Sequence, residues 1–226
     1  MSYFTIGSTG FVGSHFLTKA LESPEVTKIF SLTRKDFEAN GDKLTKLVSK
    51  NTEEWTDIIK ESKDVPAHST FFSAFGTTRK TAGSAENFVR IDHGINYSCF
   101  KAAKESGKYD TAIIVSSVGA NKDSFLLYLK TKGQLEQDII DLKFKKTIIL
   151  RPGFLMGQRN APVDMNGKIG GFIGNLTRGT FFSGLAGHPV YAEEVAKCAL
   201  KMSLEPIGKA GEVIVVESKE IIDLAK

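Results

Sequence analysis

Cysteine is scarce in this sequence, and the two that occur, Cys99 and Cys198, stand far apart. Neither belongs to a Cys-x-x-Cys pair or to a Cys/His pattern with metal-site spacing, so the sequence predicts no disulfide framework and no structural zinc site. His68, His93 and His188 also lack companions suited to metal binding. We therefore expect no metal, a reducing intracellular setting and both cysteines within helices.

Long apolar runs are missing as well. The region with the most apolar character, Ile169–Ala186, is interrupted by glycines and by Arg178, and it falls short of the ~20 apolar residues that span a bilayer. The first apolar run, Tyr3–Ile6, passes directly into a glycine turn, so we do not expect a cleaved targeting peptide. The sequence predicts no transmembrane segment.

The net charge is also small, at +4 from 30 basic and 26 acidic side chains. No basic stripe with interleaved aromatic residues is present, so we expect no nucleic-acid partner. What the chain does have is the composition of an ordinary globular protein, with 41% hydrophobic and 25% charged residues over 226 positions. This length and composition predict a single domain, residues 1–226.

Short apolar runs alternate with segments of helical period along most of the chain. The runs predicted as strands are Tyr3–Ile6, Lys28–Thr33, Leu44–Val48, Thr70–Phe75, Ala112–Ser116, Thr147–Leu150 and Glu212–Val216. The segments predicted as helices are Phe11–Leu21, Glu54–Glu61, Phe88–Glu105, Tyr128–Leu142 and Ala192–Ser203. This alternation predicts an α/β fold, a Rossmann-type doubly wound parallel sheet with a small C-terminal substrate-side extension.

One segment, Gly157–Gly187, shows neither period and is rich in glycine, phenylalanine and asparagine. Long loops in such folds are more often functional covers than idle connections, so we expect a loop on the substrate side. Its phenylalanines could close over a nicotinamide, pack permanently against the sheet, or face a membrane, and its composition does not choose among these uses.

A dinucleotide fingerprint follows the first predicted strand and opens the first predicted helix, which is the context that such a fingerprint requires. Its residues are Gly7, Ser8, Thr9, Gly10, Phe11, Val12 and Gly13. Gly7 would make the turn, Gly10 would face the pyrophosphate at the helix N-terminus, and Gly13 would let the helix sit close to the sheet. The GxxGxxG spacing favours the short-chain dehydrogenase group, and an ordinary glycine-rich turn is the alternative.

The end of the second strand normally distinguishes NAD from NADP, through an acid for the ribose hydroxyl or an arginine for the 2′-phosphate. Here Arg34 and Lys35 stand at this position, where both can pair with a phosphate. Asp36 is a contrary sign, although it can balance Arg34 or lie in solvent. We therefore predict NADP(H) as the cofactor, with a solvated surface pair as the alternative interpretation of the two cations.

Tyr128 and Lys132 lie one helical turn apart in a predicted helix. This spacing puts the ammonium beside the phenol, where its charge favours the phenolate, and the lysine can also hold the nicotinamide ribose. Ser116 and Ser117 end the preceding strand, and a hydroxyl there can polarise a substrate carbonyl. We take Ser117 as the catalytic serine because it is last on the strand, with Ser116 as the alternative; a Tyr-x-x-x-Lys pair alone arises often by chance.

Several further segments carry a resemblance to a known family. They are Phe75-Gly76-Thr77-Thr78-Arg79 with Ala82-Gly83, Asp92, Ser116–Ala120, Tyr128 with Lys132-Gly133, Leu150–Gly153 and His188–Val190. With the glycine fingerprint, these residues resemble the atypical short-chain dehydrogenases/reductases, and most closely the Tat-interacting-protein oxidoreductases and their fungal relatives associated with the mitochondrial outer membrane. The resemblance covers nearly the whole chain.

The resemblance implies further placements of residues around the cofactor. It puts Arg151, Pro152, Gly153 and Phe154 beside the nicotinamide, and Phe75, Gly76 and Thr77 beside the central ribose and phosphates, with Ser116 also at the cofactor. It further implies a peripheral location on the mitochondrial outer membrane, and without that implication the chain would be expected in the cytoplasm. Asp92 and Asn96 would share one helix face, either at an active-site water chain or as a local hydrogen-bonded pair.

These residues predict an NADPH-dependent oxidoreductase that transfers hydride to or from a small carbonyl or alcohol substrate. Its pocket would draw on Phe75, Phe125, Leu126, Phe154 and the loop Gly157–Gly187, which favours an apolar or aromatic carbonyl. The alternative is an NADPH-binding regulatory or sensor protein that acts through protein contacts, for which loss of the tyrosine or lysine is typical; both are kept here. Other short-chain chemistries, such as epimerisation or dehydration, and the oligomeric state are left open.

Overall fold

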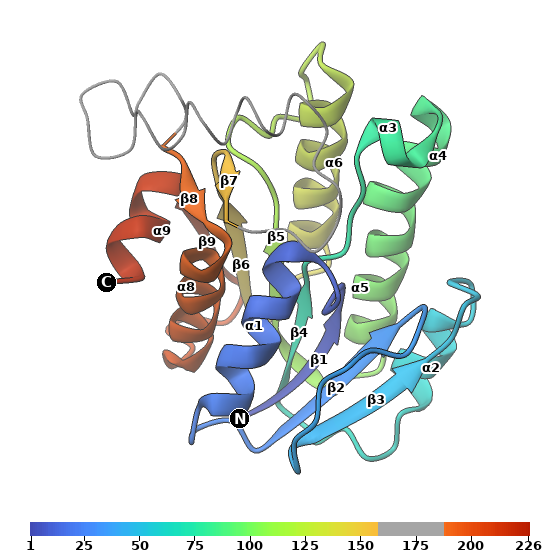
Figure 1. The fold of residues 1–226 in the computed structure, drawn as a ribbon, viewed down its shortest axis with the longest axis vertical. Helices are drawn as coiled ribbons and strands as arrows, with labels where there is room; N and C mark the ends of the chain where they lie inside the picture. The colour runs from blue at the N-terminus through green and yellow to red at the C-terminus, as the bar shows by residue number, and fades with distance from the viewer. Residues whose placement is uncertain (158–187) are drawn as a thin grey trace.

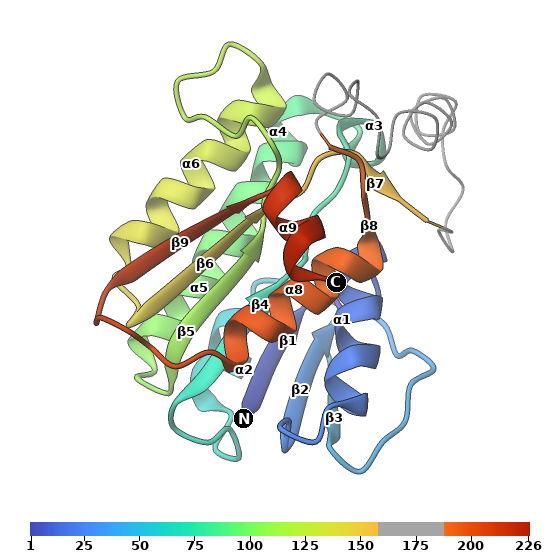
Figure 2. The same cartoon turned by 90° about the vertical axis from the view of Figure 1, so that its left-hand side faces the viewer.

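A computed structural model describes residues 1–157 and 188–226 of the chain. Its centre is a parallel sheet of seven strands in the order β3-β2-β1-β4-β5-β6-β9 (Figures 1 and 2). These strands are β1 (Ser2–Ile6), β2 (Lys28–Thr33), β3 (Leu44–Val48), β4 (Ser69–Ser73), β5 (Tyr109–Val115), β6 (Lys146–Arg151) and β9 (Glu212–Glu217). All seven predicted strands are therefore confirmed within two or three residues at each end, and the Rossmann-type parallel sheet is confirmed with them.

Helices cover both faces of this sheet, which explains why its strands read as continuous apolar runs (Figure 1). The helices are α1 (Phe11–Glu22), α2 (Trp55–Glu61), α3 (Arg79–Ala82), α4 (Ala85–Val89), α5 (Asn96–Glu105), α6 (Leu127–Asp141), α8 (Ala192–Leu204) and α9 (Ser218–Leu224). Successive side chains of a strand lie on opposite faces of the sheet. Tyr3 packs with α1 and α8, whereas Phe4 packs with α2, α5 and α6.

The predicted helix Phe88–Glu105 is not uniform. A π-helical segment, Arg90–Ile95, separates α4 from α5. The wider turn frees carbonyl groups from regular pairing, and the Asn96 side chain donates to those of Asp92 (3.1 Å) and Ile91 (3.4 Å). Such single π-turns are frequent at functional sites. The periodicity of the sequence could not distinguish this segment from an α-helix because its 6 residues make little more than one turn and show no period of their own.

The order of the strands reverses at β1, whose two neighbours are β2 and β4. In open α/β sheets, ligands bind beyond the carboxyl ends of the strands at such a switch point. On the β6 side of the same edge, β7 (Leu155–Met156) and β8 (Val190–Tyr191) form a small parallel pair that the sequence did not predict. The predicted loop Gly157–Gly187 lies outside the described residues except at Gly157.

Both cysteines lie in helices, as predicted, Cys99 in α5 and Cys198 in α8. Burial raises the pKa of each thiol to about 12, which leaves both unreactive. Within residues 1–157 and 188–226, no helix combines the length and apolar character that crossing a bilayer requires. In the same residues, no group of three or more His, Cys, Asp or Glu side chains could hold a metal.

Candidate active site

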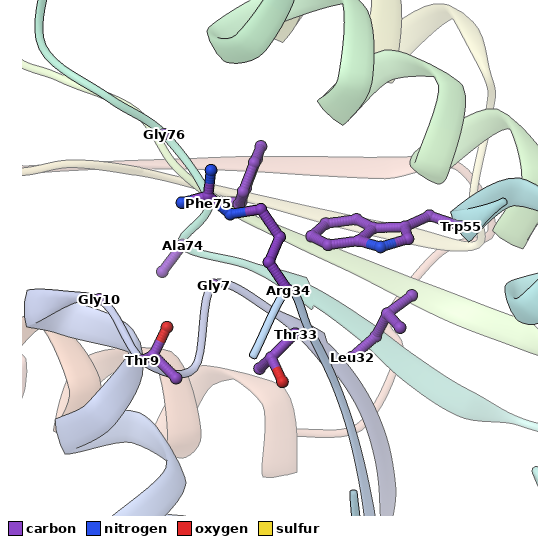
Figure 3. Close-up of a pocket in the computed structure, with 10 residues that line it drawn as sticks. All are labelled: Gly7, Thr9, Gly10, Leu32, Thr33, Arg34, Trp55, Ala74, Phe75 and Gly76. Carbon is purple, nitrogen blue, oxygen red and sulfur yellow. The ribbon is translucent and has the colours of Figure 1, made fainter. Parts of the chain in front are cut away.

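A cavity of about 200 Å³ opens at the switch point of the sheet (Figure 3). Its lining comes from the carboxyl ends of β1, β2 and β4 and from α2: Gly7, Thr9, Gly10, Leu32, Thr33, Arg34, Trp55, Ala74, Phe75 and Gly76. The Arg34 side chain extends toward Phe75, and its guanidinium carbon lies 5.9 Å from the ring centroid. Trp55 is buried, with its indole N–H bonded to the Ser49 carbonyl (3.1 Å), so the cavity has one rigid aromatic wall.

The glycine loop at the floor of this cavity tolerates no side chain at two of its positions. Gly7 has φ +83°, and a Cβ there would lie 2.5 Å from the Phe75 backbone nitrogen. A Cβ on Gly13 would lie 2.1 Å from the Gly7 carbonyl oxygen. Gly7 therefore makes the turn and Gly13 allows α1 to approach it, as the spacing predicted, whereas contact of Gly10 with a pyrophosphate stays a prediction.

A chain of buried hydroxyl groups holds the loop from below. The Ser8 hydroxyl lies 2.8 Å from the Thr5 hydroxyl and accepts a hydrogen bond of 2.8 Å from Ser31. Since Thr5 belongs to β1 and Ser31 to β2, this chain fixes the loop to both strands. The Ser8 side chain is buried and takes part in this chain, so contact of Ser8 with the cofactor, predicted from the sequence, would involve its backbone and stays a prediction.

A wider groove of about 620 Å³ continues from the cavity along the ends of β2 and β3. Its lining residues are Thr9, Arg34, Lys35, Asp36, Phe37 and Lys50. Lys50 is a third cation that sequence analysis missed, because its place beside Arg34 depends on the pairing of β2 with β3. The Asp36 carboxylate pairs with Lys46 (3.3 Å) and is largely exposed, so it does not neutralise Arg34.

The predicted proton-transfer pair lies on α6 with its side chains on one face. Tyr128 is 44% exposed, and its ring centroid lies 5.9 Å from that of Phe88. Lys132 is buried, with its Nζ 6.0 Å from the Tyr128 ring centroid. The phenol can therefore reach a ligand from the solvent side while the ammonium stays beneath it.

Lys132 is also paired with an acid that comes from another helix. Its Nζ lies 2.8 Å from Oδ1 of Asp92, and both side chains are almost fully buried. Burial by itself lowers the pKa of the Lys132 ammonium, but attraction to Asp92, with smaller effects of Tyr128 and Glu136, outweighs it. The net result is a pKa raised above the ordinary value of lysine, so Lys132 carries its positive charge at neutral pH.

Of the two strand-end serines, one is already engaged. The Ser116 hydroxyl is buried and donates to Glu136, whereas Ser117 is half-buried and its hydroxyl reaches only the neighbouring Val118 carbonyl (3.3 Å). Ser117 is thus the freer hydroxyl of the pair. Its catalytic role stays a prediction.

Arg151 serves mainly to hold elements together. Its Nη2 lies 2.6 Å from Oε2 of Glu136, and its Nη1 lies 3.0 Å from Oε1 of Glu217. The hydrogen bond that the guanidinium donates to Glu136 raises the pKa of Arg151, against a smaller opposing effect of burial. Although the Arg151–Phe154 segment leaves β6 at the expected edge, the Arg151 side chain joins β6 to α6 and β9.

The next residues of that segment are fixed through their backbone. The Gly153 N–H donates to the Ser218 hydroxyl (2.8 Å), which in turn donates to the His188 carbonyl (2.6 Å). The Phe154 carbonyl accepts from the Val190 N–H (3.0 Å). Pro152 is buried. The two described ends of the chain that flank residues 158–187 are thereby held together.

The segment after β4 connects the glycine loop with the pair on α6. The Thr77 N–H donates to Oδ2 of Asp92 (2.7 Å), and Gly76 is so close that a Cβ there would lie 3.0 Å from Oδ1 of Asp92. Of the predicted pocket residues outside this segment, Phe125 is fully exposed and Leu126 is largely exposed. Their contact with a substrate stays a prediction.

The chain is similar to several known sequences. A sequence model of the HIM1 family matches residues 40–177. The chain is 46% identical over 229 residues to "Protein FMP52, mitochondrial" of Debaryomyces hansenii, covering 100% of this chain and 99% of that protein. The chain belongs to the FMP52 family. FMP52 proteins of Candida albicans and Saccharomyces cerevisiae are 45% and 38% identical, each over 100% of this chain and 98% and 96% of their own lengths.

Solved structures share the fold of this FMP52-family chain. MoeE5 in complex with UDP-glucose and NAD superposes with a TM-score of 0.66 at 16% identity, over 100% of this chain and 81% of that one. The Bordetella bronchiseptica enzyme WbmF in complex with NAD+ gives 0.68 at 14%, over 99% and 76%. A short-chain dehydrogenase family protein of Francisella tularensis gives 0.63 at 12%, over 97% and 98%. At these identities the likeness establishes the fold.

Proposed function

We propose that this protein is an NADP(H)-dependent oxidoreductase that transfers hydride between the dinucleotide and a small carbonyl or alcohol substrate. The observation that carries the proposal is the connection between the two halves of the site. The glycine loop and the pair Tyr128/Lys132 face the same edge of the sheet, and Asp92 joins Lys132 to the backbone of Thr77 in the segment that borders the loop.

The residues present fit a dinucleotide. The loop Gly7–Gly13 leaves backbone room that a Cβ would fill, at the N-terminus of α1, where a pyrophosphate is favoured. The cavity walled by Leu32 and Trp55 suits an adenine ring, and the segment Phe75–Thr77 would border the ribose and phosphates. When bound, the dinucleotide supplies the hydride.

The choice of NADP over NAD rests on the groove at the ends of β2 and β3. Arg34, Lys35 and Lys50 line it together, and none of them forms an ion pair with another described side chain. A 2′-phosphate would offer these cations a compact dianion, and Arg34 can bind it through two N–H groups. Of the solved neighbours named above, MoeE5 and WbmF are complexes with NAD, so the proposed choice of NADP rests on the residues of this chain alone.

The chain's own residues would act on the substrate as follows. In the direction of reduction, the Tyr128 hydroxyl donates a proton to the carbonyl oxygen, and in the direction of oxidation it receives one. Lys132 supplies the fixed positive charge beneath Tyr128 and hydrogen bonds toward the nicotinamide ribose. Ser117 donates a hydrogen bond to the substrate oxygen and orients it.

Two measurements test the proposal. Titration of the purified protein with NADPH and NADH should show tighter binding of NADPH, and NADPH should be consumed with at least one member of a panel of apolar and aromatic carbonyls. Equal affinity for both dinucleotides would contradict the assignment of Arg34, Lys35 and Lys50. Tight NADPH binding without turnover of any carbonyl would favour a regulatory NADPH-binding protein instead.

One observation favours that second candidate. Val118, Phe125 and Leu126 are exposed close in sequence to Ser117 and Tyr128, and such apolar side chains are suited to a protein contact. A location at the mitochondrion, peripheral to the outer membrane, is proposed from the names of the FMP52 relatives and from the resemblance described above. Carbonate extraction and protease treatment of intact mitochondria would test it.

A further inference from the structure

A buried carboxylate stands between the two halves of the proposed site. Asp92 is 1% exposed and lies in the π-helical segment Arg90–Ile95. Its two oxygens face different elements: Oδ2 accepts the Thr77 N–H from the segment after β4 (2.7 Å), and Oδ1 lies 2.8 Å from Nζ of Lys132 on α6. One side chain therefore fixes the border of the cofactor cavity and the lysine of the proton-transfer pair at the same time.

We propose that Asp92 is a positioning residue, which keeps the buried Lys132 ammonium charged and holds it in register with the cofactor-binding segment Phe75–Thr77. The role of Asp92 toward the cofactor-binding segment rests on the function proposed above. Its role in keeping Lys132 charged does not, because that role concerns the protein without any ligand.

Among the groups around Lys132, Asp92 is the one that balances its charge. The charged and titratable neighbours of Lys132 are Asp92 from the π-helical segment and Tyr128 and Glu136 from α6. Glu136 already accepts two hydrogen bonds from Arg151 of β6, at 3.1 and 2.6 Å. It accepts a third from the hydroxyl of Ser116, the residue that follows β5. Its charge is therefore balanced elsewhere, which leaves Asp92 as the direct counterion among the described residues.

The position of Asp92 is itself held from several sides. Asn96 donates to the Asp92 carbonyl and to the Phe75 carbonyl, each at 3.1 Å, and accepts a hydrogen bond from Ser73 at the end of β4 (2.6 Å). Gly76 packs over the ion pair with no room to spare, since its Cβ would lie 3.0 Å from Oδ1. The π-turn thus presents the carboxylate to β4 and α6 together.

Replacement of the Asp92 carboxylate by an amide removes the charge of the side chain and nearly keeps its shape. In Asp92→Asn the side-chain oxygen can still accept the Thr77 N–H, but the counterion of Lys132 is gone. Burial is then opposed only by the smaller effects of Tyr128 and Glu136, so we expect the pKa of Lys132 to fall, by up to several pH units for a fully buried amine. The stability of the unmodified protein and the stability of Asp92→Asn should therefore change with pH in opposite directions.

The sign of the effect on stability follows from proton linkage. With a folded-state pKa above that of the unfolded chain, Lys132 contributes the same stability throughout pH 7–9.5 and loses it only at higher pH. In Asp92→Asn the folded-state pKa lies below the unfolded value. The unfolded chain then binds more protons between the two values, so the stability of the variant rises with pH in that window.

The first experiment is thermal unfolding of the ligand-free protein at pH 7–9.5. The unfolding midpoint of Asp92→Asn, taken relative to the unmodified protein, should rise by roughly 3 °C or more per pH unit over part of this range. Adding Lys132→Met should abolish the slope. Asp123→Asn, at an exposed carboxylate, should show none. An Asp92→Asn variant whose midpoint parallels that of the unmodified protein at every pH would overturn the proposal.

The second experiment measures NADPH affinity in the same variants. Affinity of Asp92→Asn should fall by about 10-fold or more between pH 6 and pH 9 beyond any change in the unmodified protein, as Lys132 loses its proton. Asp92→Glu, which restores the charge, should remove that pH dependence. If NADPH fails to bind the unmodified protein, the proposed function fails, and the thermal experiment still decides the role of Asp92.

Discussion

Single side chains divide the work of the site between chemistry and recognition. Tyr128 is the residue that would touch the reacting oxygen, because it is the exposed member of a pair whose other member is buried. Lys132 is the buried cation beside it, and Arg34 lies in the groove at the ends of β2 and β3, where the 2′-phosphate is proposed to bind. Changes at these positions should therefore affect different steps.

Tyr128→Phe keeps the ring that packs beside Phe88 and removes only the hydroxyl. Carbonyl reduction should fall by ~100-fold or more, since a positioned proton donor contributes that much, while NADPH affinity should change little. Single-turnover oxidation of NADPH and a binding titration measure the two quantities separately. Turnover at the rate of the unmodified protein would rule out Tyr128 as the proton donor.

Arg34→Ala removes the cation that can bind a phosphate through two N–H groups. NADPH should bind about 10- to 100-fold more weakly, the equivalent of a charge-assisted hydrogen bond of ~1.5–3 kcal/mol, while NADH affinity should be nearly unchanged. Lys63→Ala is the matched control, because Lys63 lies in the connection between α2 and β4, at the amino ends of the strands. Equal losses for both dinucleotides would place Arg34 elsewhere than at the 2′-phosphate.

Among the elements, α1 depends most on a single residue for its place. Gly13→Ala would force a Cβ to 2.1 Å from the Gly7 carbonyl oxygen, so α1 and the glycine loop must separate. We expect a loss of ~1–3 kcal/mol in unfolding free energy, as for overpacked cores, together with weaker NADPH binding. Gly94→Ala is the control, since a Cβ there meets no atom within 4 Å outside its own turn of helix. Urea unfolding of the two variants would show the difference, and equal stabilities would contradict this account of α1.

The C-terminus of α8 is tied to β6 by a buried lysine. Lys146 is 1% exposed, and its Nζ donates to the carbonyls of Met202 and Glu205, both at 2.9 Å. A cation at this end of a helix satisfies carbonyl groups that lack intrahelical partners. Lys146→Met keeps the apolar stem but leaves those carbonyls unpaired, so unfolding free energy should fall by ~2–3 kcal/mol. NADPH affinity should not change, and a concurrent loss of it would show that α8 also shapes the distant site.

At the scale of the whole molecule, the dinucleotide should act as a clamp. Its proposed path runs from the groove at β2 and β3, over the glycine loop after β1, to α6, and so touches both halves of the sheet. NADPH at 100 times its dissociation constant adds about 2.7 kcal/mol, which for a chain of this size raises the unfolding midpoint by roughly 5–10 °C. NADH at the same concentration should raise it less. A thermal scan with each dinucleotide measures both shifts, and identical shifts would argue against selection of NADPH.

Local spacing was enough to predict the seven strands of the sheet, five of its helices, the glycine turn and the Tyr128/Lys132 face. Each of these depends on residues within a few positions of one another: the continuous buried run of β1, φ +83° at Gly7, or one turn of α6. Even so, the same local reasoning missed the π-turn at Arg90–Ile95 and the short elements β7, β8 and α9, whose apolar periods are too brief to detect.

Contacts between residues that are distant in the chain could not be predicted from local spacing. The pairing of Asp92 with Lys132, the place of Lys50 beside Arg34, and the capture of Arg151 by Glu136 and Glu217 all follow from which strands are neighbours. A buried charge takes whichever opposite charge the packed elements bring within about 4 Å, and no spacing in the sequence encodes that distance. Sequence periodicity therefore supplied the elements and the candidate chemistry, whereas packing of the helices on the sheet decided which charges meet and which remain free for a ligand.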